Sequence, residues 1–300
     1  MGTTHSKDIS FVIPAKNEAD GIGQVLNEIQ QRFSESEIVV VNDGSTDRTA
    51  EIAREYGAIV IDHLYSMGNG AAVKSGARAA TGDALVFLDG DGQHNPSDVA
   101  TLLESFDNGY DMVIGARRPD SHASAPRRWV NNIYNRLASI MTGFDIMDLT
   151  SGFRIVDACK FRTFLYLLPN GFSYPTTITM AFLRSGFMVK YDWIDARQRH
   201  KQSHSKISPI KDGLRFLLII LKVGSLFSPM RLFFPVSATV MLVGISYYAY
   251  TFVQFGRFTN MSALLILSSI IIFLIGIIAE QISALHYHAS ENHKVQSEKK

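Results

Sequence analysis

Residues 84–94 read ALVFLDGDGQH, a short apolar run that stops at two carboxylates separated by one glycine. A continuous apolar segment of this length, bounded by turn-forming residues, is typical of a strand buried on both faces of a parallel sheet. Asp89 then falls at the carboxyl end of that strand, where ligands bind in open α/β sheets because the loops diverge there. The stretch therefore predicts both the fold and the place of the site.

The residues that follow this strand are suited to hold a metal ion. Asp89 and Asp91 repel each other unless a cation lies between them, and Gln93 adds a neutral oxygen. Such an all-oxygen set suits Mg²⁺ or Mn²⁺, which also bind diphosphates. Gly90 and Gly92 let the backbone take the positive φ values that turn both carboxylates toward one point. An ordinary polar turn explains the same residues, because Asp and Gly are common in turns for local reasons.

Strands and helices alternate around this stretch. Apolar runs expected to form further strands lie at residues 9–13, 38–41, 59–61 and 112–114. Residues 22–33 and 99–106 carry apolar side chains at helical spacing, so each helix has one face to pack on a sheet. The alternation indicates an α/β domain with a largely parallel sheet.

Further polar residues come directly after these strands and would meet at the same edge of the sheet. Pro14 and Glu18 follow the first strand, Asp43 follows the second, and Arg117 follows a later one. An arginine fork suits diphosphate oxygens, although two adjacent arginines are more often a solvated surface. Residues 68–73 match a dinucleotide fingerprint only in part, because the third glycine is absent, and small residues at a helix start explain them as well.

Charge divides the chain into two parts. Lys and Arg number 29 against 28 Asp and Glu, a balance that predicts no nucleic-acid partner. Charged side chains are spread over residues 1–222 but are almost absent from 232–279. Cys159 is the only cysteine, which excludes an internal disulfide. Residues 1–8 have no apolar core of a secretory signal peptide, so we expect the first two hundred residues to stay in the cytoplasm.

The apolar part predicts a membrane anchor. Between Arg231 and Arg257, and again between Arg257 and Glu280, there is no charged side chain, and each run has about the twenty residues that span a bilayer. Two spans, at about 232–255 and 259–280, place both chain ends on one side of the cytoplasmic membrane. The Lys and Arg residues before and after the spans put that side in the cytoplasm. A buried hairpin of a soluble protein is the alternative.

Residues 213–228, GLRFLLIILKVGSLFS, are apolar apart from Arg215 and Lys222, which predicts a helix lying in the membrane interface. The expected organisation is a cytoplasmic domain over residues 1–212, an interfacial helix over 213–230, two transmembrane helices within 231–286 and a polar cytoplasmic tail over 287–300.

Five motifs occur in order along the first part of the chain: Pro14 with Glu18, NDGS at 42–45, DGDGQH at 89–94, GAR at 115–117 and DLTSGFR at 148–154. As an ordered set they resemble family 2 glycosyltransferases over about two thirds of the chain. The last motif is similar to that of the dolichyl-phosphate mannose synthase and bacterial polyprenyl-phosphate glycosyltransferase branch.

This resemblance implies a GT-A fold that binds a UDP- or GDP-linked sugar at the strand ends through a divalent metal, Mg²⁺ or Mn²⁺. It places Pro14, Glu18 and Asp43 at the nucleoside, Asp89 at the nucleotide and metal, Asp91 and Gln93 at the metal, and Arg117 near the diphosphate. The role of Asp148 stays open: it orients the acceptor, orients Arg154, or caps a helix.

A basic cluster precedes the apolar part and suits anionic headgroups: Arg197, Arg199, Lys201 and Lys206. The resemblance implies that Lys201 and Lys206, together with Arg154, bind the phosphate of a polyprenyl phosphate acceptor. The alternative, for each of these residues, is that it only helps to hold the domain on an acidic membrane surface.

Three departures from the family pattern leave the substrates open. Lys16 stands where relatives often carry an aromatic residue beside the base, so the donor nucleotide is open. Pro175 and Thr177 stand where mannose synthases tend to have glutamine and glutamate, so the sugar is open. Lys201 takes the place of the family's arginine in the segment before the apolar part.

The expected reaction is an inverting transfer in which a phosphate oxygen of the lipid displaces the nucleotide at the anomeric carbon. No strong general base is required, because the acceptor is already an anion; the metal and Arg117 would neutralise the leaving diphosphate. A homo-oligomer is compatible with this reading. The rivals are a processive polysaccharide synthase, whose glutamine-x-x-arginine-tryptophan element is matched only by Arg128 and Trp129, and a membrane scaffold without turnover.

Overall fold

The computed structural model describes residues 8–90, 92, 95–118, 125–171, 173–194, 218, 221–222, 224–225 and 228–297. The chain divides into two compact units. The first consists of Met1–Asn135 and Ile146–Phe216, and the second of Arg136–Asp145 and Leu217–Lys300. The helix α5 (Ala125–Thr142) contributes residues to both.

The first unit is built on a seven-stranded sheet in the order β3-β2-β1-β4-β6-β5-β7. The strands are β1 (Ile9–Ala15), β2 (Glu37–Asn42), β3 (Ile59–Asp62), β4 (Ala84–Phe87), β5 (Met112–Arg117), β6 (Arg154–Asp157) and β7 (Val189–Ile194). Neighbouring strands are parallel except where β6 pairs antiparallel with β4 and β5. The predicted, largely parallel sheet is thus confirmed, with β6 as its one reversed strand, which the sequence did not predict.

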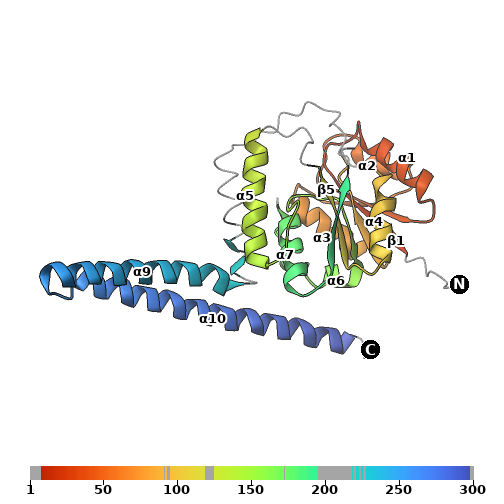
Figure 1. Ribbon diagram of the computed structural model, residues 1–300. Helices are drawn as coiled ribbons and strands as arrows, with labels where there is room; N and C mark the ends of the chain where they lie inside the picture. The colour runs from red at the N-terminus through yellow and green to blue at the C-terminus, as the bar shows by residue number, and fades with distance from the viewer. Residues whose placement is uncertain are drawn as a thin grey trace. The chain divides into compact units, whose positions relative to one another are not determined.

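Helices cover both faces of this sheet (Figure 1). They are α1 (Ile22–Arg32), α2 (Thr49–Glu55), α3 (Asn69–Ala79), α4 (Asp98–Asp107), α6 (Ala158–Arg162) and α7 (Tyr174–Arg184). The apolar sides of α1 and α4 pack with Phe11, Ile13 and Val86 in one core. On the other face, the ring of Phe87 lies 4.7 Å from that of Phe161 in α6. Because both faces are covered, β4 is buried along its whole length, as its apolar sequence predicts.

The second unit contains a hairpin of two long apolar helices, α9 (Pro229–Phe255) and α10 (Asn260–Ser297) (Figure 1). Gly256 ends α9 in a left-handed conformation, with φ of +60°, and its N–H donates to the carbonyl of Phe252. Candidate membrane spans cover Pro229–Phe255 and Asn260–Ser283, close to the two spans expected from the sequence. The predicted interfacial helix lies mostly outside the described residues.

Small residues form the contact between the two helices of the hairpin. They recur at every seventh position: Ser237, Gly244 and Thr251 in α9, and Ser262, Ser269, Gly276 and Ser283 in α10. A Cβ at residue 276 would lie 2.8 Å from the Cβ of Phe233, so the backbones approach too closely for a larger side chain. The hydroxyl of Ser237 donates across the contact to the carbonyl oxygen of Ser269 at 2.9 Å. Close approach of this kind is typical of helices that pair within a bilayer.

Candidate functional site

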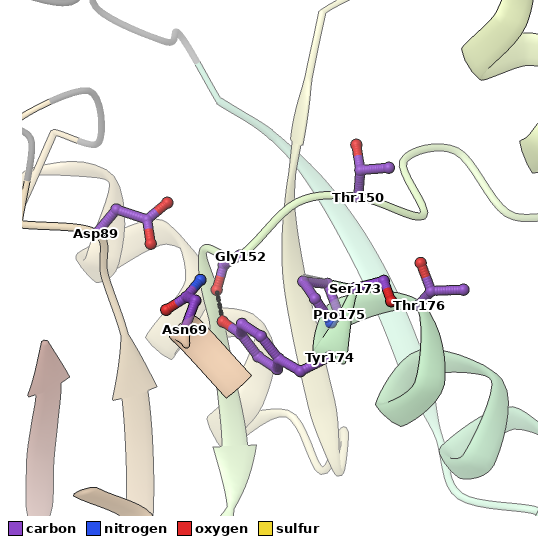
Figure 2. Close-up of a pocket in the computed structure, with 8 residues that line it drawn as sticks. All are labelled: Asn69, Asp89, Thr150, Gly152, Ser173, Tyr174, Pro175 and Thr176. Atoms are coloured by element: carbon purple, nitrogen blue, oxygen red, sulfur yellow. Dashed lines mark hydrogen bonds between the residues drawn. The ribbon is translucent and has the colours of Figure 1, made fainter. Parts of the chain in front are cut away.

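Two adjoining pockets lie in the first unit and share Asn69 and Asp89. The larger has a volume of 320 Å³ and is lined by Pro14, Ala15, Lys16, Glu18, Asp43, Ser66, Gly68, Asn69, Ala72, Asp89 and Gly90. The smaller has a volume of 90 Å³ and is lined by Asn69, Asp89, Thr150, Gly152, Ser173, Tyr174, Pro175 and Thr176 (Figure 2). The larger pocket brings together Pro14, Glu18, Asp43 and Asp89, which the sequence assigned to the donor.

Asp89 stands between these pockets, two residues after the end of β4. Its carboxylate oxygens lie 3.5 and 3.7 Å from the point that a Cβ on residue 152 would occupy, so Gly152 leaves room beside the carboxylate. Figure 2 shows Asp89 and Asn69 near Gly152, whose carbonyl accepts a hydrogen bond from the hydroxyl of Tyr174 at 3.3 Å. The carboxylate therefore faces the space where the two pockets meet.

The oxygen atoms around Asp89 are of the kind that a hard divalent cation prefers, since the carboxylate and the Asn69 amide line the same space. Asp91 and Gln93, the other predicted metal ligands, lie outside the described residues. Within the part of the chain that the structure describes, no three His, Cys, Asp or Glu side chains gather into a metal cluster. Asp89 fits a metal site that needs further ligands.

The glycines beside Asp89 differ from what the sequence suggested. Gly92 has a positive φ of +73°, as predicted, but Gly90 does not. A Cβ at residue 90 would stand 3.3 Å from the Cδ1 of Ile22 and 3.4 Å from the Cβ of Ala15. Glycine at position 90 therefore serves close packing and not an unusual backbone angle.

Arg117 is held in a fixed orientation by the loop before β6. Its Nε donates to Asp148 at 2.9 Å and its Nη2 donates to the other oxygen of the same carboxylate at 3.1 Å. The Nη2 also donates to the hydroxyl of Thr150, which lines the smaller pocket, at 2.6 Å. Within the described residues, the side chain that Asp148 orients is thus the guanidinium of Arg117 and not that of Arg154. Its predicted contact with the acceptor stays a prediction.

The charges of this pair stabilise each other. Burial alone would raise the pKa of Asp148, but the hydrogen bonds and the positive charge of Arg117 bring that pKa below its ordinary value. Burial lowers the pKa of Arg117, an effect outweighed by Asp148 and, through charge alone, by Asp89. A fixed cation therefore stands near the carboxylate that faces both pockets.

Arg154 does not occupy the position expected of an acceptor ligand. The side chain is fully buried, and its Nη1 donates to the carbonyl of Pro175 at 3.4 Å and to the hydroxyl of Thr179 at 3.1 Å. Its Nη2 donates to the carbonyl of Ser151. Burial lowers the pKa of Arg154. The predicted contact with an acceptor phosphate is wrong for this buried side chain, which instead ties the loop before β6 to α7.

The remaining acceptor residues, Lys201 and Lys206, lie outside the described residues, so their predicted role stays a prediction. The partial dinucleotide pattern is explained by packing. A Cβ at residue 70 would lie 2.0 Å from the carbonyl oxygen of Pro169, and Gly68 takes a φ of +100° against Asn170. Small residues at the start of α3 thus allow the loop before α7 to approach closely, as the sequence alternative proposed.

Sequence reasoning missed the partners of Asp43. This carboxylate is buried and accepts hydrogen bonds from His63, Ser66, Met67 and Gly68. Burial would raise its pKa, but these bonds together lower the pKa to about 2. A single histidine after a predicted strand forms no pattern, so only its place at a strand end could have drawn attention to His63.

The mixed sheet with pockets at its strand ends defines a GT-A type of α/β fold. Residues 10–164 match the family described as glycosyl transferase family 2, and residues 228–285 match the GtrB C-terminal hairpin. The chain belongs to glycosyltransferase family 2. The second match coincides with the hairpin of α9 and α10, and the protein is a membrane glycosyltransferase.

Curated relatives match from about half to nearly all of this chain. Glycosyltransferase AglJ of Haloferax volcanii is 26% identical over 289 residues, covering 93% of this chain and 94% of the relative. Undecaprenyl-phosphate 4-deoxy-4-formamido-L-arabinose transferase of Pseudomonas savastanoi pv. phaseolicola is 30% identical over 268 residues, covering 81% and 73%. The uncharacterized protein MJ1222 of Methanocaldococcus jannaschii is 36% identical over 155 residues, covering 49% of this chain and 63% of the relative.

Solved structures support the fold of the first unit. Glucosyl-3-phosphoglycerate synthase of Mycobacterium tuberculosis in complex with phosphoglyceric acid superposes with a TM-score of 0.59 at 20% identity, covering 73% of this chain and 80% of the other. The same enzyme with Mn²⁺, UDP and glucosyl-3-phosphoglycerate gives a TM-score of 0.58 at 22% identity, covering 72% and 80%. The likeness is one of fold.

Proposed function

We propose that this enzyme moves a sugar from a nucleoside diphosphate sugar to a polyprenyl phosphate, inverting the anomeric centre. The observation that carries the proposal is the position of Asp89, which faces two adjoining pockets beside the fixed cation Arg117. The match to a membrane hairpin and the undecaprenyl-phosphate transferase among the relatives favour a lipid acceptor.

The larger pocket is the proposed nucleoside site, with Pro14, Glu18 and Asp43 in its wall. The smaller pocket, on the other side of Asp89, is the proposed place of the sugar. The nucleotide is UDP or GDP, and UDP has the added support of the solved glycosyltransferases. Asp89, together with Asp91 and Gln93, would hold Mg²⁺ or Mn²⁺, which when bound neutralises charge on the diphosphate.

Arg117 is the proposed stabiliser of the leaving nucleotide. Its guanidinium is oriented by Asp148, and a cation fixed before the reaction needs no reorganisation as charge develops. An oxygen of the acceptor phosphate forms the new bond to the anomeric carbon while the bond from that carbon to the diphosphate oxygen breaks. The nucleoside diphosphate leaves with the bonding electrons. No proton has to be removed, because the attacking phosphate is already an anion.

The acceptor is proposed to enter from the membrane. Lys201 and Lys206 are the candidate ligands of its phosphate, and the interfacial helix at 213–230 would bring that segment to the bilayer. We also propose that the catalytic domain covers residues 1–212 and that both ends of the chain are cytoplasmic, as the Lys and Arg distribution predicts. We also propose that the enzyme forms a homo-oligomer.

Sugar transfer by the detergent-purified enzyme tests this function. A panel of UDP- and GDP-sugars is offered with a short polyprenyl phosphate and Mn²⁺, and lipid-linked product is measured for the wild type, Asp91→Ala and a control, Asp107→Asn. Asp107 is an exposed carboxylate at the end of α4. We expect one donor to give a product with one sugar that Asp91→Ala loses and the control keeps. Nucleotide binding without any lipid product, or a product carrying many sugars, would overturn the proposal.

A further inference from the structure

His63 joins the end of the sheet to α3 through both of its ring nitrogens. It follows β3 directly, and its side chain is only 7% exposed. The Nδ1 lies 2.8 Å from Oδ1 of Asp43, and the Nε2 lies 2.9 Å from the hydroxyl oxygen of Ser75. Because a carboxylate only accepts, Nδ1 must carry a proton and donate to Asp43. In the neutral ring, Nε2 then accepts from the hydroxyl of Ser75.

The other three bonds of Asp43 all go to one short segment. The hydroxyl of Ser66 donates at 2.7 Å, the N–H of Met67 at 2.8 Å and the N–H of Gly68 at 2.9 Å. A carboxylate has about four acceptor positions, so with His63 the set is filled. Asp43 thus holds residues 66–68 in place, and His63 holds Asp43.

This segment forms part of the wall of the larger pocket and leads into α3. Ser66 and Gly68 line that pocket, and Asn69, the first residue of α3, lines both pockets. A Cβ on residue 44 would lie 2.7 Å from the backbone nitrogen of Ser66, so the segment is in close contact with the end of β2. The positions of three pocket residues therefore depend on one carboxylate and its orientation.

We infer that His63 is a positioning residue for the nucleotide of the donor. It lies outside the lining of both pockets and acts through Asp43, by holding that carboxylate in the orientation that shapes the pocket wall. Its loss should weaken nucleotide binding and raise the KM for the donor, while kcat changes little because Arg117 and Asp148 belong to β5 and to the loop before β6. The inference rests on the proposed function only for the identity of the donor.

Two substitutions separate the ring nitrogens of His63. In His63→Asn the side-chain amide nitrogen falls near the place of Nδ1, so a donor to Asp43 is kept. In His63→Gln the longer side chain places its amide near Nε2, so only the hydrogen bond with Ser75 is kept. Both remove the ring, so both should lower the melting temperature. Only His63→Gln should lose the bond to the carboxylate.

The experiment titrates UDP and GDP, each with Mn²⁺, into the full-length enzyme by calorimetry, and also measures melting temperature and donor kinetics. We expect His63→Gln to weaken binding of the preferred nucleotide about tenfold, as for the loss of a hydrogen bond to a charged group, and His63→Asn to weaken it less than about threefold. Equal affinities in both variants, or weakening that follows only the melting temperature, would overturn the inference. If the wild type makes no lipid product, the proposed function fails while the nucleotide titration still decides the role of His63.

Discussion

The sheet of the first unit and the hairpin of α9 and α10 are held together by opposite kinds of side chain. The sheet and the helices on it bury large residues such as Phe11, Phe87 and Phe106, whereas the hairpin buries serine, glycine and threonine along its contact. The large side chains of the hairpin point outward, and Val253 is 80% exposed. This difference follows from what surrounds each unit, which is water for the first unit and lipid for the hairpin.

In water, burial of large apolar side chains drives folding, but in a bilayer the lipid tails are as apolar as leucine and offer no such driving force between helices. Helix pairs in a membrane gain instead from close backbone approach and from hydrogen bonds between them. The first unit is therefore stabilised by packing of large apolar side chains, and the hairpin by close contact between small ones. Polar groups also have different places in the two units: Asp43 and Asp89 line a pocket of the first unit, whereas Ser237 and Ser269 meet at the helix contact of the hairpin.

The largest effect is expected where a polar group of the first unit faces a pocket. Asp89→Asn removes the charge that faces both pockets, and we expect transfer to fall by about a hundredfold to a thousandfold, the range found when one preorganised electrostatic group is lost. The melting temperature should change little, since the side chain stays the same size. Initial rates of lipid-linked product formation measure this. Activity above a tenth of the wild type would place the chemistry elsewhere.

The next largest effect is expected where a small residue lies at the contact between α9 and α10. Gly276→Leu puts a side chain where a Cβ alone already comes within 2.8 Å of Phe233, and such overpacking costs about 1–3 kcal/mol. The matched control is Ile275→Leu, one residue earlier and 47% exposed. Thermal unfolding in detergent should show a drop for the first variant only. Equal melting temperatures in both would mean that the helices are not packed closely at this position.

A smaller effect is expected from the partner of Arg117. Asp148→Asn keeps the shape but removes the negative charge, so we expect activity to fall about tenfold with the loss of one charge-assisted interaction. The pKa of Asp148 is lowered in the folded protein, so this pair stabilises the fold above the ordinary carboxyl pKa of about 3.9 and is lost as the pH falls through the lowered pKa.

Melting temperature measured against pH checks the second part of that prediction. The wild type should lose part of its advantage over Asp148→Asn as the pH falls below about 4, and keep it unchanged between neutral pH and about 5. If the difference in melting temperature stays constant across this range, the charged pair is not its cause.

The smallest effect concerns a hydrogen bond across the hairpin. Ser237→Ala removes the donor to Ser269, and polar contacts between membrane helices average about 0.6 kcal/mol. Thr239→Ala is the control, because the hydroxyl of Thr239 is exposed and bonds within its own helix, to Pro235. A loss in both variants, measured by thermal unfolding, would show that helix stability and not pairing is affected.

Much of the fold could be predicted because its signals are local. The apolar run before Asp89 predicts a strand covered on both sides, and two uncharged runs predict spans that differ from the candidate membrane spans of α9 and α10 by only a few residues. β6 escaped prediction, since its only apolar residues, Ile155 and Val156, stand between the charged Arg154 and Asp157 and form no apolar run. β7 also escaped, because its residues are mostly half-buried at the sheet edge and show no continuous apolar run.

The site divides in the same way. Residues placed by a strand end were found, since Pro14, Glu18, Asp43 and Asp89 line one pocket. Pairings over long sequence distances were not: Asp148 meets Arg117 only because β6 returns the chain to β5, and no spacing encodes that contact. Arg154 was misplaced for a related reason, because an arginine in a polar loop gives no sign that its side chain turns into the core.

The reversed strand β6 has a consequence for the order of events during synthesis. β4 and β5 do not pair with each other: each forms backbone hydrogen bonds with β6, which lies between them. The first 118 residues of a nascent chain thus contain Asp89 and Arg117 but not the strand that brings their two halves of the sheet together. The two halves of the sheet can join once residue 157 has left the ribosome, and β7 completes the sheet at residue 194, still before the first residue of α9 appears. The catalytic sheet is thus able to assemble before the membrane insertion machinery receives the hairpin.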